Sequence, residues 1–215
     1  MINEISLLRK DYTKYTDIDQ EIFSIPELYL TSLPKFDSTK IRKCIIFLWE
    51  NNQIPPKEKI LGCAKSYQFF DFEKYLSLNE DGRKFMQLQV IHHGMLDIAA
   101  DYGWNKAPLE TAYENCLTSN LIFEKEIKKR KLSPNRKQYL SLWAYCDLNC
   151  FKITWAVSDK QGNSIKKGVL LTEQPSFIDM WYRVNFHWVN DDIFIVESNY
   201  KGLITEKWQI NLSNP

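Results

Sequence analysis

The sequence is poor in glycine, with seven glycines among 215 residues. No two of them have the spacing of a dinucleotide-binding or P-loop motif, and the G-x-S-x-G motif of α/β-hydrolases is also missing. We therefore expect no glycine-rich phosphate loop. The sequence also lacks an apolar run of about 18 residues and a basic start followed by an apolar stretch. These absences predict a cytoplasmic protein without a membrane span.

Net charge and cysteine spacing exclude further classes of site. The formal net charge is +1, so the molecule as a whole does not attract nucleic acid or an anionic membrane. The spacing of the five cysteines matches neither a redox pair nor a zinc site. We expect reduced structural thiols, and neither a metal site nor a cofactor. The cysteines are Cys44, Cys63, Cys116, Cys146 and Cys150.

Periodicity divides the chain into a helical part at about 37–132 and a β part at about 138–212. A helix is predicted for 82–102, with Gly103 ending it, and another from about 107 towards 131, with a possible break at 118–120. The pattern at 41–49 fits a helix, although a buried strand fits so short an apolar run equally well. A further helix is predicted after Pro56, through Tyr67.

After Pro134 the apolar period changes from 3.6 to 2. Short turns separate the apolar segments, so antiparallel pairing is expected. We predict one α+β domain spanning 1–215, with N-terminal helices packed on a C-terminal antiparallel sheet of about six strands. The predicted strands are 139–146, 151–157, 165–171, 181–189, 193–199 and 203–210.

The predicted helix 82–102 carries the candidates for acid–base or metal chemistry. His93 and Asp97 are one turn apart, with His92 adjacent and Asp101 a further turn on. Such a pair can orient a general base or offer two metal ligands. An ordinary structural or surface pair explains it as well, because no third ligand is visible. The site remains an alternative hypothesis, that of a metal-dependent hydrolase.

The largest charge feature is the basic cluster Lys125–Lys137. Between Leu121 and Leu140 there are seven basic and two acidic side chains. A nucleic-acid surface is one interpretation. The preferred interpretation is cations at a helix C-terminus, which the helix dipole favours, because no aromatic residue lies between Glu124 and Gln138. Nucleic acid is therefore not the expected partner.

The segment 181–189 carries the candidate binding residues. Alternation predicts Tyr182, Val184, Phe186 and Trp188 on the core face of a strand. Trp181, Arg183 and His187 then share the other face, and tryptophan and arginine are enriched in binding hot spots. Packing against other elements of the chain is the competing interpretation of this face.

With no catalytic constellation visible, the sequence favours a binding protein over an enzyme. In length, in its α-then-β layout and in its aromatic- and lysine-rich composition, the chain resembles the small cytoplasmic immunity proteins of bacterial polymorphic and contact-dependent toxin systems. The resemblance implies one partner, a cognate toxin domain neutralised by direct binding. It transfers no residue role and implies no oligomeric state. A locally acidic surface would be needed for a basic toxin.

Overall fold

The computed structural model describes residues 1–9, 18–50, 55–56, 60–200 and 204–213. The chain divides into two compact units, Met1–Phe123 and Glu124–Pro215. We call them unit 1 and unit 2 and describe each by itself. This division leaves the single domain predicted for 1–215 as a prediction.

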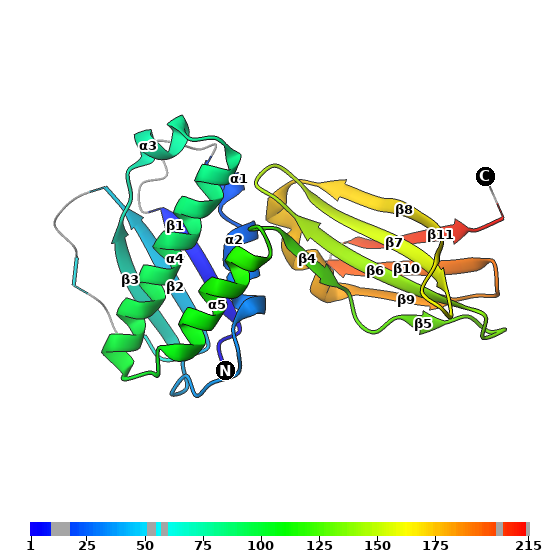
Figure 1. The fold of residues 1–215 in the computed structure, drawn as a ribbon, viewed down its shortest axis with the longest axis horizontal. Coiled ribbons are helices and arrows are strands. Elements are labelled where there is room, and N and C mark those ends of the chain that lie inside the picture. Colours follow the sequence, from blue (N-terminus) through cyan, green and yellow to red (C-terminus); the bar gives the residue numbers. More distant parts are fainter. Residues whose placement is uncertain (10–17, 51–54, 57–59, 201–203, 214–215) are drawn as a thin grey trace. The chain divides into compact units, whose positions relative to one another are not determined.

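Unit 1 contains a three-stranded parallel sheet, which Figure 1 shows beside its helices. The strands are β1 (Glu4–Arg9), β2 (Lys43–Trp49) and β3 (Cys63–Phe69), and β2 lies in the middle. Glu4 pairs with Lys43 and Lys43 pairs with Cys63, so the three strands start in register. Residues alternate between buried and partly exposed along each strand, which gives the sheet one covered and one open face.

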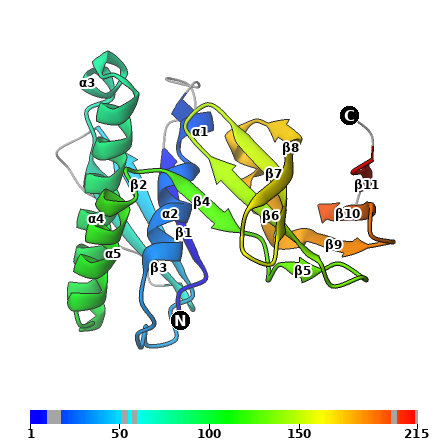
Figure 2. The same ribbon diagram turned by 45° about the vertical axis from the view of Figure 1, so that its right-hand side comes forward.

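Five α-helices are described in unit 1, namely α1 (Ile18–Glu21), α2 (Ser24–Ser32), α3 (Phe72–Ser77), α4 (Glu80–Tyr102) and α5 (Ala107–Thr118). Helix α4 contacts β2 and β3, α2 contacts β1, and α5 contacts both α2 and α4. Figure 2 shows α4 and α5 together on one side of the parallel sheet. The helices therefore have a parallel sheet of their own, which the predicted packing on a C-terminal sheet had missed.

The best-predicted element is α4. Its sequence carries its own start signal, because the Asn79 side chain accepts a hydrogen bond of 2.9 Å from the Gly82 amide. It also carries its own stop signal, because Gly103 adopts the left-handed conformation with φ of 66°. Leu88, Ile91 and Met95 of the predicted apolar stripe are fully buried. The helix predicted for 82–102 is confirmed.

Two predicted helices are strands. Residues 43–49 form β2, as the alternative interpretation of that apolar run allowed, and the helix predicted after Pro56 is wrong because Cys63–Phe69 forms β3. In β3, Ala64 and Ser66 are buried while Lys65 and Tyr67 are partly exposed, so the true period is 2. Over so few residues, apolar positions matched a helical spacing by coincidence.

Helix α5 is shorter than predicted. It ends at Thr118, inside the predicted break, because Asn120 and Leu121 both have positive φ angles and turn the chain. The continuation to Lys131 is therefore wrong.

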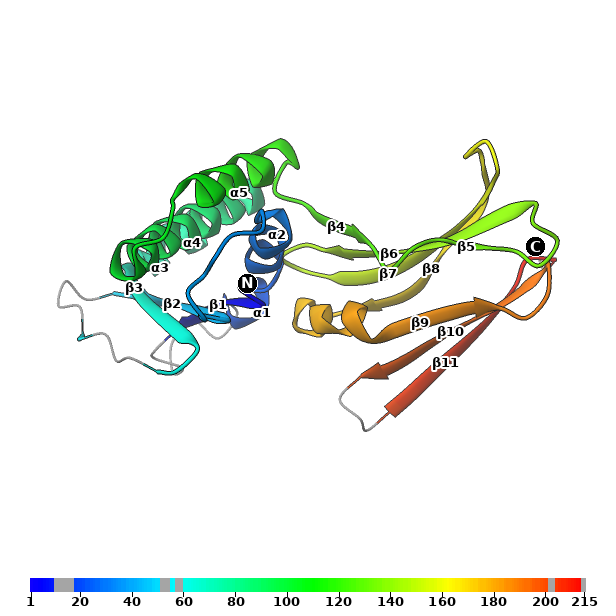
Figure 3. The ribbon, with the colours of Figure 1, turned by 90° about the horizontal axis from the view of Figure 1, so that it is seen from below.

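Unit 2 is built from antiparallel strands in two sheets, which form two layers in Figure 3. The larger sheet has the order β4-β6-β7-β8, with β5 also paired to β6, and the smaller has the order β11-β10-β9. The strands of the larger sheet are β4 (Phe123–Glu126), β5 (Lys131–Leu132), β6 (Gln138–Cys146), β7 (Phe151–Asp159) and β8 (Ser164–Glu173). The 3-10 helix η1 (Pro175–Arg183) then leads to β9 (Val184–Trp188), β10 (Ile193–Tyr200) and β11 (Ile204–Asn211).

The core of unit 2 lies between its two sheets. Leu142 of β6, Ile153 of β7 and Phe194 of β10 are fully buried. The Trp155 ring contacts the Phe194 ring edge-on at 5.3 Å, which joins the two sheets as in a β-sandwich. Trp155 also covers Gly168, where a Cβ atom would lie 2.8 Å from the ring. Glycine is therefore required beneath this tryptophan.

The predicted strands are largely present but do not form one sheet. The ranges 139–146, 151–157, 165–171 and 193–199 fall within β6, β7, β8 and β10. The range 203–210 matches β11 from residue 204, and residue 203 lies outside the described residues. The α+β class and antiparallel pairing are confirmed, whereas the single sheet of about six strands is wrong. Alternation shows which side chains are buried, but it does not show which strands pair.

Among the described residues, no helix has both the length and the apolar character needed to cross a membrane.

We predict that Gly94→Ala destabilises the protein. A Cβ at Gly94 of α4 would lie 2.5 Å from Cγ1 of Ile46 on β2, a serious overlap. Overpacking of this kind costs about 1–3 kcal/mol in the free energy of unfolding, although glycine-to-alanine in a helix ordinarily stabilises. Urea denaturation measures the change, with exposed Gln89→Ala on the same helix as the control.

Ile46→Ala supplies the second half of a double-mutant cycle, because it removes the atoms that the new methyl group would strike. The double variant should be more stable than the sum of the two single changes predicts. Strict additivity would show that the α4–β2 contact is not the cause.

Candidate functional site: the open face of the parallel sheet

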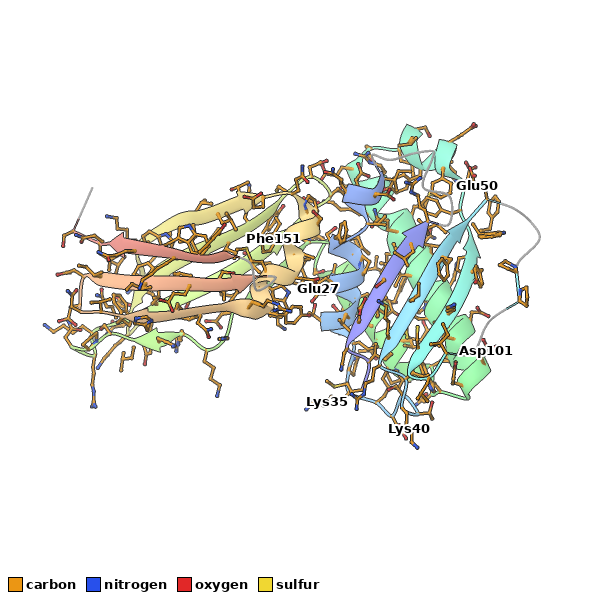
Figure 4. The ribbon with its side chains drawn as sticks, turned by 180° about the vertical axis from the view of Figure 1, so that it is seen from behind. Glu27, Lys35, Lys40, Glu50, Asp101 and Phe151 are labelled. Atoms are coloured by element: carbon orange, nitrogen blue, oxygen red, sulfur yellow. The ribbon has the colours of Figure 1, made fainter. Side chains whose placement is uncertain are left out.

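The side chains on the open face of the parallel sheet point away from α4. We define the open face as the alternate positions of the three strands that start from Glu4, Lys43 and Cys63, none of which is buried. They are Glu4, Ser6, Leu8, Lys43, Ile45, Phe47, Trp49, Cys63, Lys65, Tyr67 and Phe69. Figure 4 shows this face towards the viewer, with α4 behind the sheet.

Four aromatic residues gather at the carboxyl ends of β2 and β3. The strand register pairs Phe47 with Tyr67 and Trp49 with Phe69. The Phe47 and Tyr67 rings stack with centroids 5.0 Å apart, and Trp49 meets Tyr67 edge-on at 5.6 Å. The Phe69 side chain is 62% exposed. The cluster is ordered by its own ring contacts and yet open to a ligand or partner.

The opposite, covered face holds the sheet against α4. Ser66 donates a hydrogen bond of 2.6 Å to the Asp97 carboxylate of α4, and Gln68 donates to the Ser66 hydroxyl at 2.8 Å. With Gly94 against Ile46, these contacts fix the sheet from behind. The aromatic residues of the open face are therefore presented by a rigid support.

Charged side chains lie at both ends of the open face. Lys43 and Glu4 form an ion pair of 2.5 Å across β1 and β2. In Figure 4, Lys35 and Lys40 lie near the amino ends of the strands, while Glu50 lies at the carboxyl end of β2. All three are exposed. An apolar centre with a charged margin is the usual composition of a protein–protein interface.

The sequence predicted that Trp181, Arg183 and His187 share one strand face, and this placement is wrong. Trp181 and Arg183 belong to η1, and the strand β9 begins only at Val184. Arg183 and His187 are exposed, whereas Trp181 is half-buried. Over so few residues, alternating polarity does not distinguish the last turn of a 3-10 helix followed by a strand from one longer strand. A role of the three residues in binding stays a prediction.

The residues predicted to face the core in this segment are partly confirmed. Val184 and Phe186 are buried on β9, and Trp188 is half-buried. Tyr182 instead is 49% exposed and stacks on Trp181 with ring centroids 3.9 Å apart. The stack places an exposed tyrosine and a half-buried tryptophan beside Arg183, a composition typical of contact residues.

The structure gives the two members of the predicted acid–base pair different surroundings. His93 is exposed, whereas Asp97 is half-buried and accepts the Ser66 hydrogen bond. Asp101 is exposed at the last turn of α4. No group of three or more His, Cys, Asp or Glu side chains in the described part of the chain is arranged to hold a metal ion.

His92, the neighbour of that pair, forms a buried connection between three helices. Its Nδ1 lies 3.0 Å from the Tyr29 hydroxyl of α2, and its Nε2 lies 3.2 Å from the Glu110 carboxylate of α5. The Tyr29 hydroxyl also donates to the Leu109 carbonyl at 3.1 Å. Burial lowers the pKa of His92, although the charge of Glu110 opposes the shift. Both ring nitrogens have partners, which favours a structural role.

The cysteine prediction agrees with the structure, since all five thiols are free. Burial raises the pKa of the Cys44 thiol to about 12 and that of Cys116 to about 11. Such thiols stay protonated and unreactive at neutral pH.

Sequence reasoning missed the open face because it assigned β3 to a helix. The signal was present in Lys65, Tyr67 and Phe69, which alternate with Ala64 and Ser66. Two apolar, aromatic segments, 43–49 and 63–69, could have indicated a pair of strands.

Comparison with models of protein families finds no match, and searches of curated proteins and of solved structures find none either.

We predict that His92 makes the protein less stable in mild acid. Burial holds the folded pKa of His92 below the ordinary value of histidine, about 6.5, so the unfolded chain takes up a proton that the folded chain does not. The free energy of unfolding should therefore fall as the pH decreases from about 6.5 through the folded pKa. Thermal or urea unfolding across this pH range measures the effect.

His92→Gln removes the titrating group, so part of the acid-dependent loss should disappear, while the free energy of unfolding at neutral pH falls as the Tyr29 and Glu110 contacts change. His187→Gln, at an exposed position, is the matched control. Identical pH profiles for His92→Gln and the wild type would contradict the prediction.

Proposed function

We propose that the protein binds another protein through the open face of its parallel sheet, and that the partner is a cognate toxin domain which it neutralises in the cytoplasm. The observation that supports this proposal is the aromatic cluster of Phe47, Trp49, Tyr67 and Phe69. Parallel sheets are ordinarily covered on both faces, so an open face of this composition favours a docking surface.

The chemistry of the cluster suits a protein partner. Tryptophan and tyrosine dominate binding hot spots because they bury a large area and lose little conformational freedom. Phe47 and Tyr67 already stack, so their rings need little further ordering when a partner binds. The cluster thus has the features of a pre-organised interface centre.

The size of the face limits the kind of contact. Three strands about 4.8 Å apart and about 20 Å long present roughly 300 Å² in projection, while a stable interface buries about 800 Å² per partner. A neutralising partner must therefore also contact the charged margin. That margin includes Lys35 and Lys40 at one end and Glu50 at the other. Mixed charges there supply selectivity more than affinity.

The class of partner rests on the resemblance to immunity proteins described above. A large exported toxin encoded beside this gene, whose toxic domain co-purifies with the protein and whose activity the protein inhibits, is the expected finding. A neighbouring toxin that the protein neither binds nor inhibits would contradict the proposal.

We predict that Phe69→Glu weakens this binding strongly. The substitution places a charge within the aromatic cluster, so affinity for the toxin domain should fall by about 30-fold or more, as at other hot spots. Isothermal titration calorimetry measures the loss. Phe85→Glu is the matched control, because Phe85 is also exposed, at 40%, but lies on α4. Equal losses from both changes would exclude the open face as the interface.

The predicted binding residues of unit 2 require a separate test. If Trp181 and Arg183 contact the same partner, then Trp181→Ala and Arg183→Ala should each weaken binding by about fivefold or more. Circular dichroism and thermal melts establish that each variant is folded. Unchanged affinity in folded variants would show that these two residues lie outside the interface, whatever Phe69→Glu does.

A further inference from the structure

The larger sheet of unit 2 has an outer face that the proposed function does not use. On β6, Leu140, Leu142 and Ala144 are buried in the core of unit 2. The alternate residues Tyr139, Ser141, Trp143 and Tyr145 therefore point outward, and all four are partly exposed. We call the outward positions of β6, β7 and β8 the outer face.

Aromatic side chains form a row along β6 on this outer face. Trp143 and Tyr145 are two residues apart, so their side chains rise from the sheet about 6.8 Å from each other, and Tyr139 lies further along the same line. Spaced aromatic rings on an open antiparallel sheet are a platform on which successive bases can stack.

Cations stand directly beside these rings. The Arg130 guanidinium lies over the Tyr139 ring, 4.3 Å from its centroid, and the Lys152 ammonium lies 5.8 Å from the Tyr145 centroid. The register pairs Tyr145 with Lys152, and places Lys167 opposite Ala156 on the same face. Arginine and lysine next to stacking rings provide the contacts that phosphates require.

Along β7 and β8 the outer face carries no acidic side chain, whereas the Tyr145 hydroxyl donates a hydrogen bond of 2.9 Å to the Asp147 carboxylate just beyond β6, and the neighbouring strand β4 carries Glu124 and Glu126. The outward positions of β7 are Lys152, Thr154, Ala156 and Ser158, and their partners on β8 are Thr172, Val169, Lys167 and Ser164. None of these is a carboxylate. Unit 2 as a whole has fourteen Lys and Arg against ten Asp and Glu, so it is the basic half of the chain.

The basic cluster Lys125–Lys137 joins this face at the β5 side. The sequence interpretation of this cluster as cations at a helix C-terminus is wrong, because α5 ends at Thr118 and the cluster lies on β4, β5 and the turns around them. Lys128 bonds to Asn185 and Lys131 lies over the Phe186 ring, so these two point towards β9. Lys129, Arg136 and Lys137 are exposed and extend the basic surface.

The basic cluster contains no aromatic residue of its own, but the neighbouring strand β6 places aromatic residues beside it. No aromatic residue lies within 124–138, but pairing of β5 with β6 places Leu132 opposite Tyr139 and brings the cluster beside the aromatic row. Aromatic and basic residues that are separate in sequence are therefore adjacent on the sheet.

We propose that the outer face of β6–β8 binds single-stranded nucleic acid, with bases stacked on Tyr139, Trp143 and Tyr145 and phosphates held by Arg130, Lys152 and Lys167. A single strand suits the site better than a duplex, because only unpaired bases can lie on the rings. It suits the site better than an acidic protein, because a purely electrostatic partner would not use the aromatic row. This activity is independent of the open face in unit 1.

The test is fluorescence anisotropy of the full chain with labelled oligothymidine and oligouridine of about 12 nucleotides, a length within the range that one such platform spans. Binding should weaken steeply between about 50 and 200 mM salt, with a slope near 0.7 per phosphate contact. Tighter binding of one oligonucleotide assigns the preference for DNA or RNA. No binding to either at low salt overturns the proposal.

Two pairs of variants separate stacking from charge. Trp143→Ala should weaken binding by about 5- to 100-fold, while Trp143→Phe, which keeps an aromatic ring, should retain most of it. Lys167→Glu should weaken binding and lower the salt slope, whereas Lys207→Glu on β11 of the smaller sheet makes the same charge change and should do neither. Thermal melts show that each variant is folded.

Three other results would also overturn the proposal. The first is equal loss from Lys167→Glu and Lys207→Glu, which indicates a general effect of charge. The second is undiminished binding by folded Trp143→Ala. The third is competition by duplex DNA or polyglutamate as effective as that by a single strand, which assigns the surface to any polyanion. Phe69→Glu should leave oligonucleotide binding unchanged, so the result is independent of the proposed protein partner.

Discussion

The contact between Gly94 of α4 and Ile46 of β2 determines the geometry of unit 1. The helix approaches the middle strand so closely that no side chain fits between them. This brings the covered face of the sheet into direct contact with the helical layer and leaves Cys44, Ile46 and Leu48 fully enclosed. Because strand residues alternate, enclosing one set necessarily directs Ile45, Phe47 and Trp49 to the other side. The aromatic open face is thus a direct result of how the core is packed.

Local signals in the sequence predicted local structure well. The cap at Asn79, the apolar stripe and Gly103 define α4 within the chain segment itself, so its limits were predicted to within two residues. The same holds for β6, β7 and β8, where turn residues and alternation are close together in sequence. These elements need no distant partner to be recognised.

What the sequence could not reveal depends on distant contacts. β3 became a strand because it pairs with β2, although its apolar spacing also fitted a helix. The assignment of six strands to two sheets follows from contacts such as Trp155 with Phe194, which no periodicity encodes. The outer-face rings next to the basic cluster were missed for the same reason, because the two lie on different strands. Whether the candidate face was open or covered could not be told from the sequence; Arg183 and His187 are exposed, but the strand face that was to unite them with Trp181 does not exist.

The parallel pairing of β1 with β2 has a consequence for how the chain folds. Glu4 pairs with Lys43, 39 residues further along the chain, whereas Tyr200 of β10 pairs with Ile204 of β11, only four residues away. Closing the longer loop between β1 and β2 costs more conformational entropy before any stabilising contact forms. The hairpins of unit 2 should therefore form ahead of the parallel sheet. During synthesis the order of emergence is the reverse, because unit 1 leaves the ribosome first. The strand β1 therefore stays without its native partner until β2 has also been synthesised, and during that time its unpaired edge needs protection from aggregation.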